Sequence, residues 1–148
     1  MPASSFLPDH QPAEPGHLYL VTGSRDLPRL DLVWEWGRSL PSAAFLMHGA
    51  ARGVDTEAAR GFLHFHPIHQ VLRRPANWSF DGIGAGVLRN HRMVDECVRL
   101  RQEGWAVWVT AFWDGASSGT KDCIDYAVSQ GFAVTINHPY KPQETRTC

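Results

Sequence analysis

The sequence predicts a single α/β domain in which a parallel sheet lies between two layers of helices. Three observations support this fold class: apolar runs alternate with amphipathic segments over residues 17–136, several runs end in glycine-rich sequence, and 148 residues suffice for one domain. Alternating strands and helices are typical of parallel sheets with right-handed crossovers. We therefore expect a five-stranded parallel sheet in the order 3-2-1-4-5.

The strands are predicted from short apolar segments that are flanked by glycine, proline or polar residues. They are residues 17–22, 43–47, 67–72, 105–112 and 132–136.

The helices are predicted from apolar residues at helical spacing and from their end signals. Pro28 suits the start of the first helix, and Asp55 is placed to cap the second or to favour its N-terminus by its charge. Gly104 and Gly131 are placed to end the last two. The segments are residues 30–40, 56–63, 85–103 and 123–130.

The two ends of the chain predict flexible segments rather than further domains. Residues 1–16 are rich in proline and lack the basic and apolar regions of a signal peptide, so we expect a flexible leader. Residues 137–148 are polar and contain two prolines, which indicates a flexible tail. No apolar run approaches the ~20 residues of a membrane span, so no membrane partner is expected.

Composition narrows the possible partners. A net charge of -1 and a pI near 6.7 disfavour non-specific binding to nucleic acid. The three cysteines form no CxxC pair, which suits a reducing cytoplasm, and the eight histidines lack ligand spacing, so neither a metal site nor a cofactor is expected. A homo-oligomer is compatible with the sequence.

Three junctions between predicted strands and helices carry the signals of a ligand site. Residues 114–120 read DGASSGT, a loop whose small residues let backbone amides approach an anion at a helix N-terminus. The alternative is a simple turn with Ser118 or Thr120 as N-cap. Residues 23–26 and 49–55 carry similar signals. Since ligands bind beyond the carboxyl ends of parallel strands at the switch point, we expect one shared site there.

Single residues at these junctions leave alternatives open. Arg89 opens a helix and is expected to contact an anion, or else to be a solvated residue. Arg25 has the same expectation, or a salt bridge to Asp26 or Asp55. Trp78 stacks a base or plugs its loop. The predicted ligand-binding residues are Gly23, Ser24, Arg25, Gly49, Arg52, Asp55, Trp78, Arg89, Asn90, Asp114, Gly115, Ser118, Gly119 and Thr120.

Five short motifs in this order resemble the YspA-like branch of the SLOG superfamily: VTGSRD at 21–26, HGAARGVD at 48–55, PANW at 75–78, GVLRN at 86–90 and SGT at 118–120. The resemblance covers residues 17–136. It implies a Rossmann-like domain that binds a nucleotide or an ADP-ribose-like molecule at the sheet edge.

The superfamily also contains the LOG phosphoribohydrolases and the DNA-processing protein DprA. In the LOG enzymes a glutamate stands where this chain has Cys123, and the arginine pair corresponds to Arg89 and Asn90. Asp122 lies one residue earlier, about 100° round the helix. Cys123 is expected to be a packing residue rather than a nucleophile, and Asp122 and Asp114 become the candidate catalytic residues.

Three functions follow as expectations. The first, which we favour, is a module that binds or senses a nucleotide-derived small molecule without chemistry. The second is a LOG-like N-glycosidic hydrolase in which Asp122, Asp114 or Asp26 replaces the glutamate. The third is DprA-like binding of single-stranded DNA, against which the net charge argues.

Overall fold

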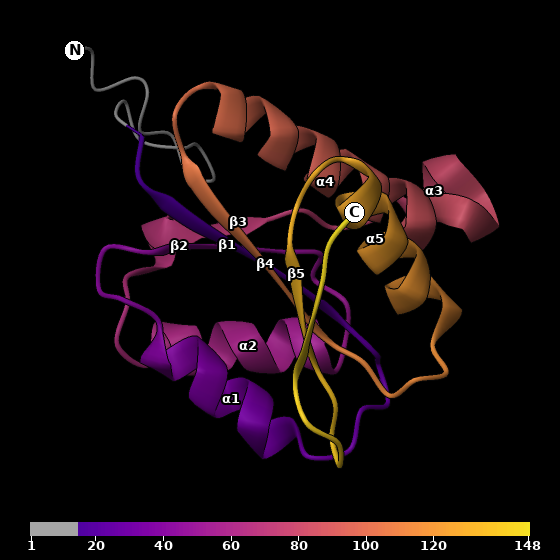
Figure 1. The fold of residues 1–148 in the computed structure, drawn as a ribbon, viewed down its shortest axis with the longest axis horizontal. Helices are drawn as coiled ribbons and strands as arrows, with labels where there is room; N and C mark the ends of the chain where they lie inside the picture. The colour runs from indigo at the N-terminus through magenta and orange to yellow at the C-terminus, as the bar shows by residue number, and fades with distance from the viewer. Residues whose placement is uncertain (1–14) are drawn as a thin grey trace.

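The computed structural model describes residues 15–148 and contains a six-stranded sheet flanked by helices (Figure 1). The strands are β1 (His17–Gly23), β2 (Phe45–His48), β3 (Val71–Arg73), β4 (Ala106–Phe112), β5 (Val134–Asn137) and β6 (Glu144–Arg146). The helices are α1 (Leu30–Ser39), α2 (Val54–Leu63), α3 (Trp78–Asp81), α4 (Ala85–Gln102) and α5 (Ser118–Ser129). Two 3₁₀ helices, Ile68–Gln70 and Gly82–Gly84, precede β3 and α4.

The sheet has the order β3-β2-β1-β4-β5-β6, in which the first five strands are parallel. The predicted fold class and the predicted order of these five strands are confirmed. Successive strands are added on one side of β1 up to β3 and on its other side from β4 onwards. The strands β1 and β4 pair along their whole lengths, from His17 with Ala106 to Gly23 with Phe112. The switch point therefore lies between the ends of these two central strands.

The helices form two layers, one on each face of the sheet (Figure 1). Helices α1 and α2 cover one face over a core that includes Val33, Leu46 and Phe62. Helices α4 and α5 cover the other face, where Cys97 and Ile124 are fully buried. The ends of β1, β2, β3 and β4 at the carboxyl edge are each followed by helices, whereas β5 leads into β6.

Helices α1 and α2 approach each other closely through two glycines. A Cβ added to Gly61 would lie 2.0 Å from the carbonyl oxygen of Trp34, and one added to Gly37 would lie 2.2 Å from that of Ala58. Since real Cβ atoms do not come so near, neither position accommodates a larger residue without moving a helix. This contact fixes α2, whose first turn borders the carboxyl edge.

The prediction of a flexible tail at residues 137–148 is wrong. Residues 144–146 form β6, which pairs antiparallel with β5 from Val134 with Arg146 to Ile136 with Glu144. Charged and polar residues make up this strand, so its hydrogen bonds are main-chain bonds to the sheet edge rather than contacts of an apolar face. The predicted leader lies outside the described residues except for positions 15 and 16.

Two predicted element boundaries also differ from the structure, and the loop after the third strand contains a short helix. The third strand is shorter than residues 67–72, because a 3₁₀ turn takes up its first half. The loop after it contains the short helix α3, which Asn77 caps by accepting a hydrogen bond from the Phe80 amide. Helix α5 begins earlier than predicted and has Ser117 as its N-cap, in place of Ser118 or Thr120.

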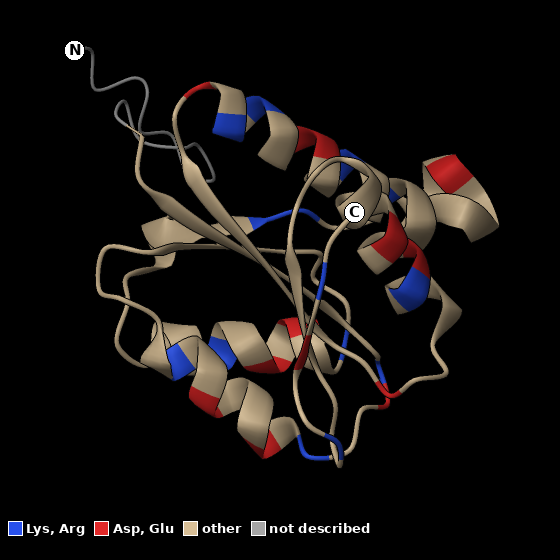
Figure 2. Ribbon diagram, in the orientation of Figure 1, with Lys and Arg blue, Asp and Glu red and all other residues tan. Residues whose placement is uncertain are grey.

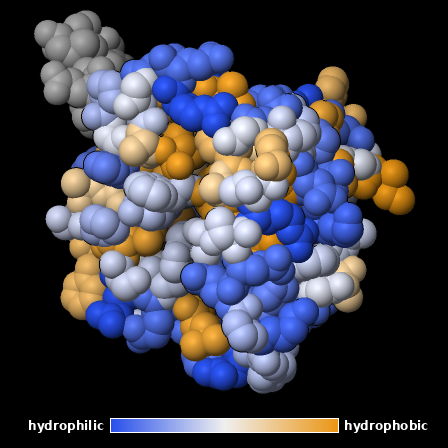
Figure 3. Space-filling model, in the orientation of Figure 1, coloured by the Kyte–Doolittle hydropathy of each residue, from blue (hydrophilic) through white to orange (hydrophobic). Residues whose placement is uncertain are grey.

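The charged side chains of both signs are spread over the helices of the described residues. Figure 2 shows basic and acidic residues interspersed along the outer sides of the helices. Apolar residues come to the surface at the edge of the molecule where α3 lies (Figure 3), and these include Phe80 and Ile83. Among the described residues, no helix has the length and apolar character needed to cross a membrane.

Candidate ligand cleft

The loops that follow β1, β2 and β4 enclose a cleft of about 640 Å³ together with α3 and the start of α4. Twelve of the predicted ligand-binding residues line it: Gly23, Ser24, Arg25, Arg52, Asp55, Trp78, Arg89, Asn90, Asp114, Ser118, Gly119 and Thr120. The cleft lies at the carboxyl edge of the sheet, beside the switch point. The structure therefore brings together segments that are up to 97 positions apart, from 23 to 120.

The first loop is fixed to its neighbours through backbone contacts. The Ser24 amide donates to the carbonyl oxygen of Phe112 at 3.1 Å, and the Ser24 hydroxyl accepts from the Asp114 amide at 3.2 Å. A Cβ on Gly23 would lie 2.6 Å from the Val54 side chain, so only glycine fits where β1 meets α2. The loops after β1 and β4 consequently form one rigid wall.

The second loop turns sharply between β2 and α2. Ala50 has a φ of 59°, in the left-handed region that non-glycine residues rarely adopt. The His48 Nδ1 atom accepts from the Ala50 amide at 2.9 Å, and Asp55 Oδ2 accepts from the amides of Gly49 and Ala51 at 3.1 and 3.2 Å. Asp55 lies inside α2 rather than capping it, and its carboxylate instead holds the preceding loop.

Arg89 reaches from α4 into this loop. Its Nη1 donates to the Gly49 carbonyl oxygen and its Nε donates to Asn90 Oδ1 at 2.7 Å. A Cβ on Gly49 would lie 2.5 Å from the guanidinium, so the glycine is required for this approach. Burial lowers the pKa of Arg89, with Asp55 acting in the opposite direction. The prediction of a solvated or purely ligand-binding arginine missed this structural role.

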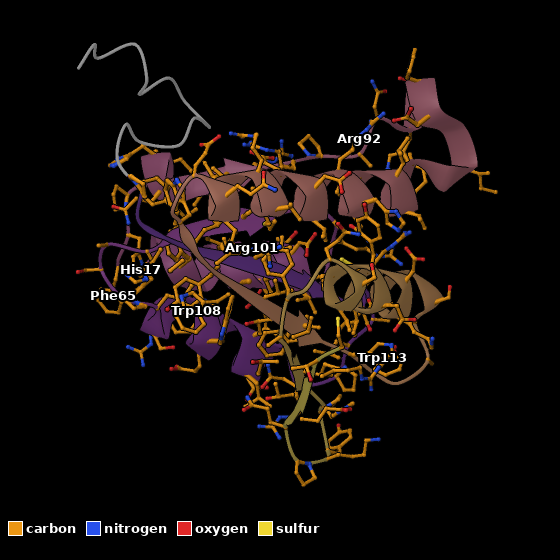
Figure 4. The ribbon with its side chains drawn as sticks, turned by 45° about the horizontal axis from the view of Figure 1, so that its top comes forward. His17, Phe65, Arg92, Arg101, Trp108 and Trp113 are labelled. Atoms are coloured by element: carbon orange, nitrogen blue, oxygen red, sulfur yellow. The ribbon has the colours of Figure 1, made fainter. Side chains whose placement is uncertain are left out.

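The third loop is organised by the side chain of Asp114. Asp114 Oδ1 accepts from the amides of Ala116 and Ser117 at 2.9 and 2.8 Å, and these bonds hold the pKa of Asp114 below its usual range. Trp113, labelled in Figure 4, donates from Nε1 to the Ser117 carbonyl oxygen at 3.0 Å. Asp114 therefore shapes the turn, and one of its oxygens is already occupied.

The amides of Ser118 and Gly119 remain without partners among the described residues. They belong to the first turn of α5, where four amides lack intrahelical partners, while the Thr120 amide donates to Ser117. A Cβ on Gly119 would meet nothing within 4 Å, and Gly119 does not have a positive φ. This is the part of the loop at which an anion can accept hydrogen bonds from the backbone.

The exposed cations of the cleft differ in how they are paired. Arg52 lies 3.6 Å from Asp26, an exposed ion pair that is worth little. Arg25 forms no ion pair among the described residues, so the predicted alternative of a salt bridge to Asp26 or Asp55 is not formed. Arg25 is thus free to meet an anion in the cleft.

Trp78, on α3, also lines the cleft. Its ring packs on α4, where a Cβ added to Gly86 would lie 3.5 Å away, yet 52% of the residue is exposed. The ring also lines a side compartment of about 400 Å³ that includes Gly49, Pro75 and Ala76. An indole that is supported on one side and open on the other suits stacking against a flat ring.

Two predicted residues lie outside the main cleft, and several lining residues were missed. Gly49 lines only the side compartment, and Gly115 lines neither. The missed lining residues are Thr22, Asp26, Ala51, Ile83, Gly86, Val87, Ala116 and Ser117. Most are sequence neighbours of predicted residues. Ile83 was not predicted, because it lies between the predicted elements and outside the three glycine-rich loops.

The candidate catalytic residues do not form a catalytic pair. Asp122 points away from the cleft, and its Oδ2 lies 2.7 Å from Nε2 of His91 on α4. Cys123 is fully buried, which confirms that it packs in the core, and burial raises the pKa of its thiol to about 12. A thiolate at this position is therefore disfavoured at neutral pH.

The environment of His48 predicts a stability that depends on pH. Burial, with Arg73 and Arg89 nearby, lowers the pKa of His48 from 6.5 to about 4. Since the unfolded chain binds the proton more readily, His48 stabilises the fold above pH ~6.5, and this contribution is lost as the pH falls towards 4. The free energy of unfolding, measured with urea, should rise between pH 4 and pH 7 by about 2 kcal/mol more for the wild type than for His48→Gln.

Asp55 acts in the opposite sense over much of the same range. Its pKa is raised to about 6 by burial, so it favours folding below pH ~4 and this contribution is lost as the pH rises through 6. The comparison with His48→Gln leaves Asp55 unchanged in both proteins. A constant difference between them at all pH values would contradict the assignment of His48.

The chain is similar to the Gene 61 protein of Mycobacterium phage D29. The two sequences are 35% identical over 140 residues, which cover 83% of this chain and 97% of the phage protein. No family model matches the chain, and no solved structure matches it significantly. The name of the phage protein states no activity, so function has to be inferred from the cleft.

Proposed function

The chain belongs to the same family as the Gene 61 protein of Mycobacterium phage D29, and we propose that it binds a nucleotide or a nucleotide-derived ligand such as ADP-ribose. One observation carries the proposal: the loops after β1, β2 and β4 converge with α3 on a single cleft at the switch point. The motif resemblance to the YspA-like branch of the SLOG superfamily supports the same class of ligand.

The two ends of the cleft suit the two ends of a nucleotide. The α5 side offers the unpartnered amides of Ser118 and Gly119 and the exposed guanidinium of Arg25, which favour phosphate. The α3 side offers the open face of Trp78, which favours a base. Mass spectrometry of the small molecules released when the purified protein is denatured tests the proposal, with a nucleotide as the expected result. Release of an unrelated metabolite in an amount stoichiometric with the protein would exclude the proposal.

Hydrolysis of the N-glycosidic bond is the second candidate, because the floor of the cleft carries the buried carboxylate of Asp55. Glycosidases need a carboxylate beside the charge that develops on the sugar. The other candidates fit less well. Asp122 lies outside the cleft, and Asp114 is tied into its own turn. Asp26 lines the cleft but is exposed and lies beside Arg52.

We expect no useful cleavage of nucleoside monophosphates by the wild-type protein. A neutral, buried thiol at position 123 cannot stabilise an oxocarbenium ion or orient water. The check is a chromatographic assay for free adenine after incubation with AMP over hours, beside a blank without protein. Release at ordinary enzymatic turnover, ~1 per second or faster, would promote the hydrolase and make Asp55 the first carboxylate to replace.

A further inference from the structure

The two carboxylate oxygens of Asp55 have different surroundings at the floor of the cleft. Oδ2 accepts from the amides of Gly49 and Ala51, while no hydrogen bond within the described chain engages Oδ1. No polar side-chain atom of the described residues is both fully enclosed and without a partner. Because Asp55 lines the cleft, its Oδ1 is open to the ligand space.

No cation of the described chain neutralises this carboxylate directly. Arg89 is near enough to influence the pKa of Asp55, but the two form no ion pair, and two arms of the guanidinium are already bonded. Asp55 is only 6% exposed. A buried carboxylate oxygen that lacks a donor is costly, so a ligand that supplies a neutral donor there gains affinity.

The position of Asp55 shows which part of a nucleotide would supply the donor. Trp78 on α3, Ser118 and Gly119 on α5, and Asp55 on α2 all line the same cleft. A nucleotide with its base on the indole and its phosphate at the start of α5 carries its sugar between them. The donors of that sugar are hydroxyl groups.

We infer that Asp55 accepts a hydrogen bond from a ribose hydroxyl of the ligand and thereby favours nucleotides that carry this hydroxyl over those that lack it. The inference rests on the proposed function, since it places a nucleotide in the cleft. It assigns to Asp55 a part in recognition as well as in holding the loop. The pKa of about 6 means that the carboxylate is ionised, and a strong acceptor, at pH 7.5.

Calorimetric titration at pH 7.5 with AMP, 2′-deoxy-AMP and 3′-deoxy-AMP tests the inference. Wild type should bind at least one deoxy compound about 10- to 100-fold more weakly than AMP, the range for a hydrogen bond to a charged group. Asp55→Asn keeps an oxygen that can accept from the two loop amides but presents an amide nitrogen in place of Oδ1. In this variant the discrimination should fall to about twofold or less.

The control is Asp125→Asn. In the wild type the Asp125 carboxylate pairs with Lys121 on the exposed side of α5, so this substitution should leave the discrimination unchanged. Equal affinity of the wild type for all three nucleotides would overturn the role of Asp55 but leave the proposed function standing. Undiminished discrimination by Asp55→Asn would also overturn it. If no AMP binds at all, both proposals fail. The wild-type series decides even if the variant is unstable.

Discussion

Gly119→Val should weaken nucleotide binding by about 100-fold or more while leaving the protein folded. Gly119 lines the cleft in the first turn of α5, and its amide is one of the two that remain unpartnered. A side chain there enters open space rather than the protein, because nothing lies within 4 Å of the added Cβ. The valine would therefore occupy the volume of the anion without straining the chain.

The substitution acts through the space that it fills. The backbone of Gly119 does not have a positive φ, so the substitution acts on the ligand and not on the conformation. Gly84→Val is a matched control, since that glycine also faces open space but does not line the cleft. Calorimetry with AMP or ADP-ribose measures both variants. Wild-type affinity in folded Gly119→Val would show that the loop after β4 does not hold the anion.

Arg89→Ala should reduce both stability and binding, with the free energy of unfolding falling by roughly 2 to 4 kcal/mol. The side chain holds the Gly49 carbonyl oxygen and Asn90, and its loss would leave these groups and the Asp55 carboxylate without their cationic neighbour. Affinity should fall as well, by about 10- to 100-fold, because the loop loses its conformation and the cleft loses a donor.

Urea unfolding and calorimetry measure the two effects separately. Arg92→Ala is the matched control on the same helix, since Arg92 pairs at the surface with Asp81 and does not line the cleft (Figure 4). Arg89→Lys should restore the charge but not the two-pronged contact, and should remain weaker than wild type. An Arg89→Ala protein with wild-type stability and affinity would contradict the role of Arg89 in holding the loop at Gly49.

The sheet was predictable because its strands bury apolar residues on both faces. Runs such as residues 105–112 are recognisable in isolation, and right-handed crossovers leave few orders for five parallel strands. The strand β6 was not predictable in this way. Residues 144–146 pair with β5 through their backbone and carry no apolar pattern.

The location of the cleft was predictable, but not its internal bonding. Small residues after three strands mark the loops, whereas the contact of Arg89 with Gly49 joins positions 40 residues apart. Likewise, nothing in the order of residues shows that the loop after β4 folds on the Asp114 carboxylate. Such contacts depend on the packed helices and not on local preference.

The burial of Cys123 was predicted from the sequence, and its helical spacing supports that prediction. Buried positions in α5 follow the helical spacing of Thr120, Cys123, Ile124 and Ala127, which is the face towards the sheet. Asp122 belongs to the outer side of this pattern, where it meets His91. The prediction that Cys123 packs in the core is confirmed, because its thiol is fully buried.

The most direct test of nucleotide binding in the cleft is titration of the wild-type protein with AMP while backbone amide shifts are followed by NMR. Binding as proposed predicts saturable changes concentrated in residues 23–26, 49–52 and 117–120, with the largest at the amides of Ser118 and Gly119. A different groove lies between α1 and the β5–β6 segment, where it is lined by Trp36, Phe112 and His138. Changes confined to that groove, or none at saturating AMP, would contradict the account.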